Sequence, residues 1–462
     1  MELKGKKVLV AGLGKTGLAL VSLLMEHGAE VLVSDTRERS GLEEQRKAFQ
    51  GKGLPVVMEG GGHTEAFFNQ ADLILLSPGI PLDLPALAQA RQRGVPVWGE
   101  LELFSILCQT PVAAVTGTNG KTTTTALLNE MLVASGKKTF LGGNIGRPLT
   151  EYLLKGQDLD LVVAEISSFQ LDTAWHFSPI LGLLLNITED HLDRYPDFQA
   201  YQNSKASLFR NQGEKGMAVL NWDDPIVRSL GERLPGPVFY FSRREKVFPG
   251  AYLDPQGILL EMGSRSERYH LNGFSLPGLH NRENALAALL GARLLEASPE
   301  AVQRTLQTFK GFGHRLEWVG EVRGVRFYDD SKGTNVGAVV KALEGFSEPV
   351  YLIAGGRDKG GDYSPLKPWI QQKCKGLALI GEAQQVMKDQ LGALTRTFLA
   401  RTLEEAVSWS FQQAAPGEVV LLSPACSSFD MFRDYGHRGE VFQKAVKELG
   451  RDYPAKEQIA EG

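Results

Sequence analysis

The sequence predicts an α/β protein of three domains: an N-terminal Rossmann-like domain, a central α/β domain of the P-loop type and a C-terminal Rossmann-like domain. Three observations support this prediction. The chain has 462 residues, which is too long for one hydrophobic core. Its apolar runs are short and continuous, as is typical of parallel strands buried on both faces. Glycine-bearing loops follow several of these runs, as in sheets that bind ligands at strand ends.

The apolar runs fall into three series, and we expect one domain for each, over residues 1–99, 100–311 and 312–462. The first series alternates with helical patterns at 18–27 and 85–93, which indicates a doubly wound unit. Between positions 236 and 276, the residues alternate around turn signals, which predicts a small antiparallel arrangement of strands. A helical stretch follows at 283–297. The predicted parallel strands are 8–11, 31–34, 73–76 and 95–98; 111–116, 161–166, 181–187 and 217–221; and 325–329, 350–354, 377–380 and 419–423.

Composition excludes several classes of protein. The chain is 43% hydrophobic and 23% charged, which is typical of a globular enzyme and not of a disordered or fibrous chain. A net charge of −4 gives no basic field for nucleic acid, so we expect no such partner. No apolar run reaches the length of a membrane span, and residues 8–11 are interpreted as a strand and not as a signal peptide. Three widely spaced cysteines favour a reducing, cytoplasmic compartment.

The sharpest local signal is the loop that follows the predicted strand 111–116. It reads Thr116-Gly-Thr-Asn-Gly-Lys-Thr-Thr123 and runs into a helical pattern at 126–134. Backbone amides and a helix N-terminus would cradle phosphates, Lys121 would reach the β- and γ-phosphates, and a threonine hydroxyl would ligate Mg²⁺. The pattern is a shortened P-loop, because Val115 stands where the strict motif has glycine. The phosphate-contacting residues would be Gly117, Thr118, Asn119, Gly120, Lys121, Thr122 and Thr123.

A second glycine motif follows the first predicted strand. Gly12-Leu-Gly-Lys-Thr-Gly17 opens a helix, and Asp35 stands at the end of the next strand. This pattern is typical of dinucleotide binding, with a pyrophosphate at the helix N-terminus and an acid on a ribose hydroxyl. Alone it predicts an NAD-dependent dehydrogenase. The physical requirement is only a diphosphate, so another nucleotide diphosphate conjugate fits equally, and an empty glycine turn is the third interpretation.

Acidic residues follow two further central strands. Glu165 follows the apolar run 161–164, where a carboxylate could ligate a metal beside cradled phosphates. His191 lies in Asn186–Asp193 after the next strand, and it either ligates Mg²⁺, transfers a proton or is structural. Lys205 lies in the helical pattern 198–209, where a solvated lysine is the simplest interpretation.

Three strand ends in the last series carry polar residues. They are Tyr328–Asn335, Ala354–Lys359 and Ser423–Asp430, and together they predict a second binding edge. Cys426 lies in the third of them. No histidine adjoins it, so we interpret Cys426 as a packed thiol and not as a nucleophile.

In this order the segments resemble the Mur ligases of peptidoglycan synthesis over almost the whole chain. The Ser423–Phe432 segment and the Rossmann-like first domain favour the members that add D-glutamate; a folylpolyglutamate synthase, which shares the loop, would lack that domain. The resemblance rests on Gly12–Gly17, Asp35–Arg37, Ser77–Ile80, Thr116–Thr123, Gly143–Gly146, Glu165–Gln170, Thr188–Asp193, His280-Asn281 with Asn284, His314-Arg315, Asp330–Asn335 and Ser423–Phe432.

The resemblance implies an ADP-forming ligase that couples D-glutamate to UDP-N-acetylmuramoyl-L-alanine. ATP would phosphorylate the alanyl carboxylate, and the amine of D-glutamate would attack the acyl phosphate. Lys121 and two Mg²⁺ ions would offset the repulsion between the anions. Thr122 and Glu165 would hold one ion, and Glu165 and His191 the other. The resemblance also implies that Lys205 is carbamylated and ligates the second ion.

The resemblance assigns the remaining contacts residue by residue. Lys15 stands where the family usually has an apolar residue, and Tyr435 where a phenylalanine is common. The UDP substrate would contact Gly14, Lys15, Thr16, Asp35, Thr36, Arg37, Ser77 and Asn144. ATP would contact Asn281, Asn284, Arg315 and Asp330. D-Glutamate would contact Lys332, Thr334, Lys359, Ser428, Phe429 and Tyr435.

Three rival interpretations stay open at this point. The dehydrogenase rests on the Gly12–Gly17 motif alone and leaves the 116–123 loop unused. A Mur ligase that attaches a different amino acid is the second, and a non-catalytic nucleotide-binding regulator is the third. For the ligase we expect a cytoplasmic monomer without membrane insertion, and a third domain that closes about a hinge near residues 311–313.

Overall fold

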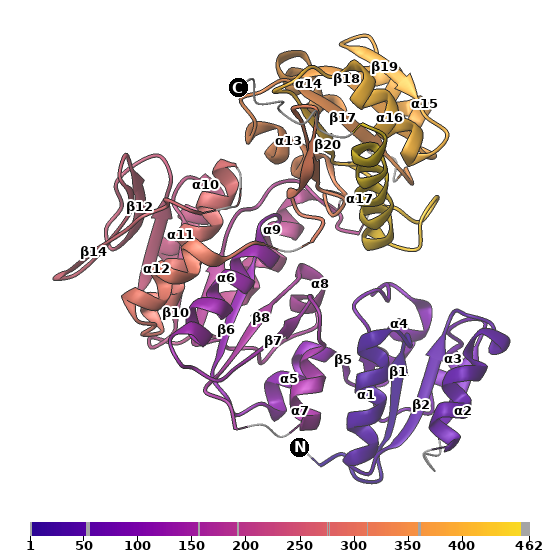
Figure 1. The fold of residues 1–462 in the computed structure, drawn as a ribbon. Helices are drawn as coiled ribbons and strands as arrows, with labels where there is room; N and C mark the ends of the chain where they lie inside the picture. Colours follow the sequence, from indigo (N-terminus) through magenta and orange to yellow (C-terminus); the bar gives the residue numbers. More distant parts are fainter. Residues whose placement is uncertain are drawn as a thin grey trace, which may run out of the picture. The chain divides into compact units, whose positions relative to one another are not determined.

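The computed structural model describes residues 2–51, 56–155, 158–191, 194–274, 276, 278–311, 313–358 and 362–453. The chain folds around three β-sheets of five, nine and six strands (Figure 1). It divides into two compact units, of which the first comprises Met1–His270 with Ala285–Thr305 and the second Leu271–Asn284 with Leu306–Gly462. The first two sheets belong to the first unit and the third sheet to the second, so three sheets confirm the predicted α/β class.

The first sheet is entirely parallel, with the strand order β3-β2-β1-β4-β5. Both faces are buried, because Val8 and Val10 pack into one core while their neighbours Leu9 and Ala11 pack into another. The sheet order reverses between β1 and β4, which is where open α/β sheets bind ligands. The elements are β1 (Lys7–Ala11), α1 (Lys15–Glu26), β2 (Glu30–Asp35), a 3₁₀ turn (Arg39–Leu42), α2 (Glu43–Gly51), β3 (Val56–Gly60), α3 (Glu65–Phe68), β4 (Leu73–Leu76), α4 (Pro85–Gln92), β5 (Val97–Gly99) and α5 (Glu100–Leu107).

The central sheet has the order β14-β13-β12-β11-β10-β9-β6-β8-β7. Strand β6 lies between β8 and β9, and all three run parallel, so their carboxyl ends meet at one edge. The elements are β6 (Val112–Thr116), α6 (Lys121–Ala134), β7 (Thr139–Gly143), α7 (Leu149–Lys155), β8 (Leu161–Glu165), α8 (Ser168–Leu171), β9 (Leu181–Leu184), α9 (Phe198–Ala206), β10 (Met217–Asn221), α10 (Pro225–Leu230), β11 (Val238–Ser242), β12 (Gly250–Asp254), β13 (Gly257–Met262), β14 (Arg265–Tyr269), α11 (Leu279–Leu294) and α12 (Pro299–Thr308), with 3₁₀ turns at Ser207–Phe209 and Gly231–Arg233.

The third sheet has the order β15-β16-β20-β17-β18-β19 and is parallel except for the β15–β16 pair. Alternate residues of β20 again pack into two different cores. The elements are β15 (Glu317–Val322), β16 (Val325–Asp329), α13 (Val336–Glu344), β17 (Val350–Gly355), a 3₁₀ turn (Ser364–Leu366), α14 (Lys367–Lys373), β18 (Cys374–Ile380), α15 (Gln384–Leu391), β19 (Arg396–Leu399), α16 (Leu403–Gln413), β20 (Val419–Leu422) and α17 (Tyr435–Asp452).

Two features differ from the sequence prediction. The segment 236–276 is antiparallel only in part, because β11 pairs parallel with β10 and β12 pairs parallel with β11; only β12, β13 and β14 form the predicted antiparallel arrangement. The strands that the apolar runs did not reveal are β3, β7, β15 and β19. All four lie at sheet edges, where a strand is only partly buried and lacks a continuous apolar run.

In the part of the chain that the structure describes, every helix is too short or too polar to cross a bilayer.

Candidate functional site

The predicted phosphate loop connects β6 to α6. All five residues of β6 are buried, and Gly120 then turns the chain with φ of 86°, a left-handed conformation that glycine adopts without strain. Helix α6 begins directly at Lys121. The Nζ atom of Lys121 donates to the carbonyl oxygens of Gly117 and Thr118, each at 2.9 Å. The loop therefore places a cation and a helix N-terminus together, an arrangement that favours a bound phosphate.

Glu165 lies beside the first turn of α6. The register pairs Val115 of β6 with Glu165 of β8, so the carboxylate follows the strand next to the loop. Glu165 is 2% exposed, and its Oε2 atom accepts from the Thr122 hydroxyl over 2.7 Å. Its Oε1 atom accepts from the side-chain amide of Asn144 at 2.6 Å. A carboxylate and a hydroxyl at this spacing form the oxygen donor set that Mg²⁺ prefers.

The phosphate loop is fastened to the end of β9. The Thr118 hydroxyl donates to the carbonyl oxygen of Thr188 and accepts from its backbone amide, each at 3.1 Å. Asn186 bonds both backbone groups of Asn119, accepting at 2.8 Å and donating at 3.0 Å. Sequence reasoning assigned Asn186 no role, although its position directly after a central strand was visible.

Lys205 is buried and not solvated. Its side chain points from α9 into the interior, where the residue is 1% exposed, and Nζ donates to the Gly117 carbonyl at 2.8 Å. The same nitrogen lies 4.6 Å from the centroid of the Tyr201 ring. Burial, reinforced by the positive charge of Lys121, holds the pKa of Lys205 well below the ordinary value of a lysine. The interpretation as a surface lysine is therefore wrong.

His191 lies at the rim of this group. Its backbone adopts φ of 56°, which is uncommon outside glycine and marks a position held by its surroundings. The imidazole packs against the ring of Phe169 with centroids 4.8 Å apart and remains 40% exposed. Within the first unit, the structure thus brings the phosphate loop, Glu165 and Lys205 together, with His191 joined to them through aromatic contacts.

Asp35 organises the glycine loop of the first sheet. One carboxylate oxygen accepts from the Leu13 amide at 2.7 Å and from Arg37 Nη2 at 3.1 Å. The other accepts from the backbone amide and Nε of Arg37, each at 2.9 Å. Burial alone would raise the pKa of Asp35, but the bonds from Arg37 and the backbone outweigh it and lower the pKa to about 2. All four acceptor positions of the carboxylate are used.

The loop itself is tightly closed. A Cβ atom at Gly17 would collide with the carbonyl oxygen of Gly12, which also accepts from the Ser77 hydroxyl at 2.7 Å. Ser77 therefore joins the loop after β4 to the loop after β1 at the switch point of the sheet. Three further predicted contact residues, Gly14, Lys15 and Thr36, are exposed, and Thr16 is half-buried.

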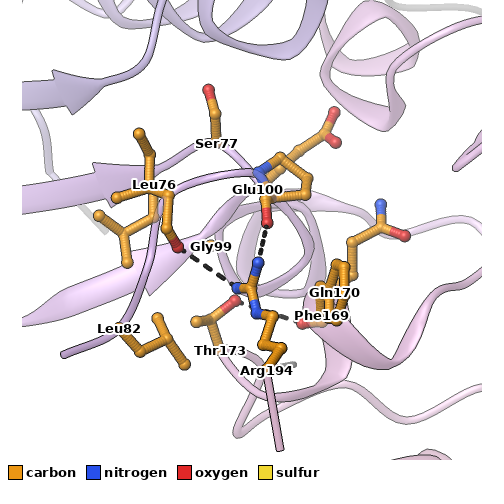
Figure 2. A pocket seen from close by; sticks show the side chains of 11 residues that line it. Leu76, Ser77, Leu82, Gly99, Glu100, Phe169, Gln170, Thr173 and Arg194 are labelled. Carbon is orange, nitrogen blue, oxygen red and sulfur yellow. Dashed lines mark hydrogen bonds between the residues drawn. The ribbon is translucent and has the colours of Figure 1, made fainter. Parts of the chain in front are cut away.

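A pocket lies between the loop after β4 and the segment after β8. It holds about 240 Å³ of space, part of it open to solvent. Figure 2 shows Arg194 between the ring of Phe169 and the loop that begins at Ser77. Sequence reasoning placed Ser77 at a substrate but gave Arg194 no role. The lining residues are Leu76, Ser77, Pro78, Ile80, Leu82, Gly99, Glu100, Phe169, Gln170, Thr173 and Arg194.

In the second unit, Asp330 lies at the end of β16. Its Oδ2 atom accepts from the Ser423 hydroxyl at 2.7 Å and its Oδ1 atom from the Leu316 amide at 3.3 Å. Burial raises the pKa of Asp330 to about 7 against the opposing effects of Ser423 and Arg315. In the first segment of the same unit, the buried residues Asn281 and Asn284 bond each other through their side chains at 3.2 Å.

The described amino-acid contacts of this unit lie on loops, except Tyr435, which begins α17. Lys332 Nζ lies 3.8 Å from the centroid of the Tyr435 ring. Ser428 is 2% exposed, whereas the adjacent Phe429 is 63% exposed. Thr334 donates its backbone amide to the carbonyl of Lys332 at 2.8 Å. Lys359 lies outside the described residues.

Arg438 was missed by sequence reasoning. Its side chain is fully buried and donates to the hydroxyl and carbonyl of Ser331 and to the carbonyls of Cys426 and Ser427. It thereby joins two of the predicted strand-end loops. Cys426 is buried and contacts the Tyr363 hydroxyl, which confirms it as a packed thiol. An arginine in an amphipathic helix that also carries Arg451 and two lysines gave no signal that it faces inward.

One group of three potential metal ligands also escaped prediction. Among the described residues, His314, Glu317 and Asp329 bring their ligand atoms within 4.8 Å of one another. The group is internally satisfied, because His314 and Asp329 bond each other at 2.7 Å and Gln443 bridges Glu317 and Asp329.

Comparison with known proteins places these features in one family. Residues 6–99 match the Mur ligase MurD-like N-terminal domain, residues 115–292 the Mur ligase middle domain and residues 314–426 the Mur ligase glutamate ligase domain. A UDP-N-acetylmuramoylalanine–D-glutamate ligase of Geotalea daltonii is 47% identical over 97% of this chain and 99% of its own. The corresponding ligase of Citrifermentans bemidjiense is 46% identical over 97% and 98%.

Solved structures show the same fold. The UDP-N-acetylmuramate–alanine ligase MurC of Thermotoga maritima superposes with a TM-score of 0.60 at 20% identity, over 96% of this chain and 99% of its own. The MurF ligase of the same organism in complex with ADP also gives 0.60, at 17% identity over 98% and 96%. The matched domains and the near full-length identity lead to one conclusion: the chain belongs to the Mur ligase family, and within it to the UDP-N-acetylmuramoylalanine–D-glutamate ligases.

Proposed function

We propose that the protein uses ATP to join D-glutamate to UDP-N-acetylmuramoyl-L-alanine and releases ADP and phosphate. The observation that carries the proposal is the strand-end loop of β6, with Lys121 at its helix N-terminus and Glu165 against Thr122, in a chain 47% identical to a named D-glutamate ligase. The reaction serves peptidoglycan synthesis. An NAD-dependent dehydrogenase finds no support in the matched families.

The chemistry explains why a phosphate loop is needed. An amine does not attack a carboxylate at neutral pH, because the two simply form a salt. An oxygen of the alanyl carboxylate therefore attacks the γ-phosphorus, and the bond from that phosphorus to ADP breaks. The amine of D-glutamate then attacks the acyl carbon, the carbon–oxygen bond to phosphate breaks, and the amine loses a proton. Both reactants of the first step are anions, so cations must lie between them.

Residues of the phosphate loop would hold the triphosphate. Amides of the loop and the N-terminus of α6 would donate to the phosphate oxygens, and Lys121 would exchange its two backbone carbonyls for the γ-phosphate. Thr122 and Glu165 offer hard oxygen ligands for a Mg²⁺ ion, and Glu165, His191 and modified Lys205 would hold a second. When bound, these ions neutralise charge on the transferring phosphoryl group. Thr123 lies in the same first turn of α6.

Lys205 is proposed to react with CO₂ to form a carbamate. The neutral amine nitrogen forms a bond to the carbon of CO₂ and loses one proton, so a neutral group becomes an anion able to ligate a metal. Only a neutral amine can do this, and the burial of Lys205 favours that form. The proposal joins this burial with the position of the residue in the family pattern.

The first sheet would bind the UDP end of the substrate. Arg37, fixed by Asp35, offers a cation beside the loop of Gly14 and Thr16, and Ser77 and Asn144 mark the path toward the phosphate loop. Lys15 is exposed at the first turn of α1, where it could pair with a diphosphate oxygen. Asp35 acts here by holding Arg37, since its own oxygens are occupied. Thr36 lies next to it at the end of β2.

The second unit would bind adenosine and the amino acid. Asp330 with Asn281 and Asn284 would contact the nucleoside, and Arg315 the γ-phosphate. D-Glutamate would lie among the loops after β16, β17 and β20. Its contacts would be Lys332, Thr334, Lys359, Ser428, Phe429 and Tyr435.

Several broader predictions belong to the same proposal. The domain boundaries at 99/100 and 311/312, the hinge near 311–313, the monomeric state and the cytoplasmic location stay predictions; Phe312 lies outside the described residues. We expect neither a nucleic-acid partner nor membrane insertion.

The proposal is tested by ATP-dependent phosphate release in the presence of UDP-N-acetylmuramoyl-L-alanine. D-Glutamate should support release, and L-glutamate, L-alanine and diamino acids should not. Release with another amino acid alone would point to a different specificity, and release without any amino acid would contradict a ligase.

A further inference from the structure

Arg194 joins two segments that are far apart in the sequence. Its Nη1 atom donates to the carbonyl oxygen of Pro78 at 3.0 Å and its Nη2 atom to that of Ile80 at 3.3 Å. Both carbonyls belong to the loop that follows β4, directly after Ser77. The guanidinium therefore holds this loop through its backbone, whatever side chains the loop carries.

The same guanidinium lies on an aromatic ring of α8, the short helix that follows β8. Its carbon is 3.9 Å from the centroid of Phe169, a geometry for cation–π attraction (Figure 2). Phe169 also contacts the ring of His191, with centroids 4.8 Å apart, and stacks on Tyr195 at 6.1 Å. Phe169 is thus placed between Arg194 and the imidazole.

The backbone adds a second connection between Arg194 and His191. The Arg194 amide donates to the carbonyl of His191 at 2.9 Å. The carbonyl that accepts this bond belongs to the residue with the left-handed φ of 56°. Such a conformation persists where surrounding contacts enforce it. Arg194 therefore contacts the 77–80 loop, the ring of Phe169 and the backbone of His191 at the same time.

We propose that Arg194 is a positioning residue that couples docking of the UDP substrate at Ser77 to the placement of His191. The inference rests on the proposed function, because it assigns the 77–80 loop to that substrate. When the substrate presses on the loop, the displacement reaches Phe169 and His191 through the guanidinium. Without Arg194, the 77–80 loop is no longer linked to Phe169 and His191.

Arginine is required by this geometry. Its planar fork reaches two carbonyls at once while its face covers a ring, which a lysine cannot do. Arg194→Lys keeps the charge and the attraction to Phe169 but loses the pair of hydrogen bonds to the carbonyls of the loop. Arg194→Gln loses the charge and the fork. Phe169→Leu keeps apolar volume and removes the aromatic face between Arg194 and His191.

The test compares steady-state kinetics and calorimetric binding of UDP-N-acetylmuramoyl-L-alanine without ATP. Arg194→Gln should raise KM and Kd for this substrate about tenfold or more and lower kcat, with KM for D-glutamate nearly unchanged. Arg194→Lys should restore less than half of the kcat/KM that Arg194→Gln loses. Phe169→Leu should lower kcat more than it raises the Kd, because it removes the ring between Arg194 and His191 but leaves the bonds from Arg194 to the 77–80 loop.

Arg93→Gln is the matched control. Arg93 also donates to a backbone carbonyl of the first sheet domain, that of Asn69 at 2.9 Å, away from the pocket lining. It should leave all constants unchanged. Wild-type constants in Arg194→Lys, or a lower Tm in Arg194→Gln with unchanged KM and Kd, would overturn the coupling. Failure of the wild-type protein to use D-glutamate would overturn the proposed function instead, and the Kd comparison would still decide the role of Arg194.

Discussion

Lys205 Nζ donates to the carbonyl oxygen of Gly117 over 2.8 Å, although 88 residues separate them in the sequence. The bond brings a buried amine to the first residue of the phosphate loop. An amine so placed is either a costly buried cation or a neutral nucleophile. The neutral form agrees with the lowered pKa of Lys205 and gives the group a chemical use.

A carbamate on Lys205 is directly observable. Protein equilibrated with ¹³C-bicarbonate should show a carbamate signal in the ¹³C NMR spectrum, and Lys205→Ala should lack it. The variant should lose at least about a hundredfold in turnover, since one metal ligand is removed, while ATP binding persists. Lys246→Ala is the control, because Lys246 is exposed and pairs with Glu261 outside the site. Full turnover in Lys205→Ala would refute the assignment.

Thr122 should act through its hydroxyl alone. Thr122→Ser keeps the oxygen that lies 2.7 Å from Glu165 and should retain most activity. Thr122→Ala should lose about 10²-fold in kcat and require more Mg²⁺ for half-maximal rate. A titration of rate against Mg²⁺ for both variants provides the measurement. Equal loss in the serine and alanine variants would show that the methyl packing matters and not the oxygen.

Asp35 should contribute stability with a defined pH dependence. Its folded pKa of about 2 lies below the ordinary 3.8, so the contribution is complete above pH 4 and fades as the pH falls through 2. We expect Asp35→Asn to lower the free energy of unfolding by about 1 kcal/mol at pH 7, reduced from the full shift because Arg37 is solvent-screened. The Tm difference between variant and wild type should shrink toward pH 2. A constant difference would contradict this account.

Arg438 should be a stability determinant of the second unit. Arg438→Leu leaves the carbonyls of Ser331 and Cys426 without their donor in the interior and should destabilise by about 3–5 kcal/mol. Thermal unfolding should show a lower Tm for the transition of this unit. Arg433→Leu, at an exposed position just before α17, should leave Tm within about a degree.

The interior strands were predictable from the sequence, and the edge strands were not. Runs such as 73–76 are buried on both faces, so hydrophobicity alone revealed β4. β19 is exposed at both ends of its four residues and carries no such run. The antiparallel prediction for 236–276 failed at β11 because alternation reports a half-buried face and not the direction of the neighbouring strand.

The same division applies to the site. Residues that directly follow a central strand, such as Glu165 and Asp35, were predictable because parallel strands end at one edge. Local pattern did not reveal Lys205 or Arg438, because a helix lysine or arginine is usually solvated and nothing local shows which way it faces; Lys205 entered only through the family resemblance. The roles of Asn186 and Arg194 depend on contacts with distant loops, which pattern alone does not contain.

The central claim is that an oxygen of the substrate carboxylate attacks the γ-phosphate held by the loop at Lys121. The most direct test labels that carboxylate with ¹⁸O and analyses the released phosphate by mass spectrometry. The account predicts one labelled oxygen in each phosphate released, formed only when ATP and D-glutamate are both turned over, and a loss of this product in Lys121→Ala. Phosphate without the label would contradict the account, because the γ-phosphate would then have been transferred to water.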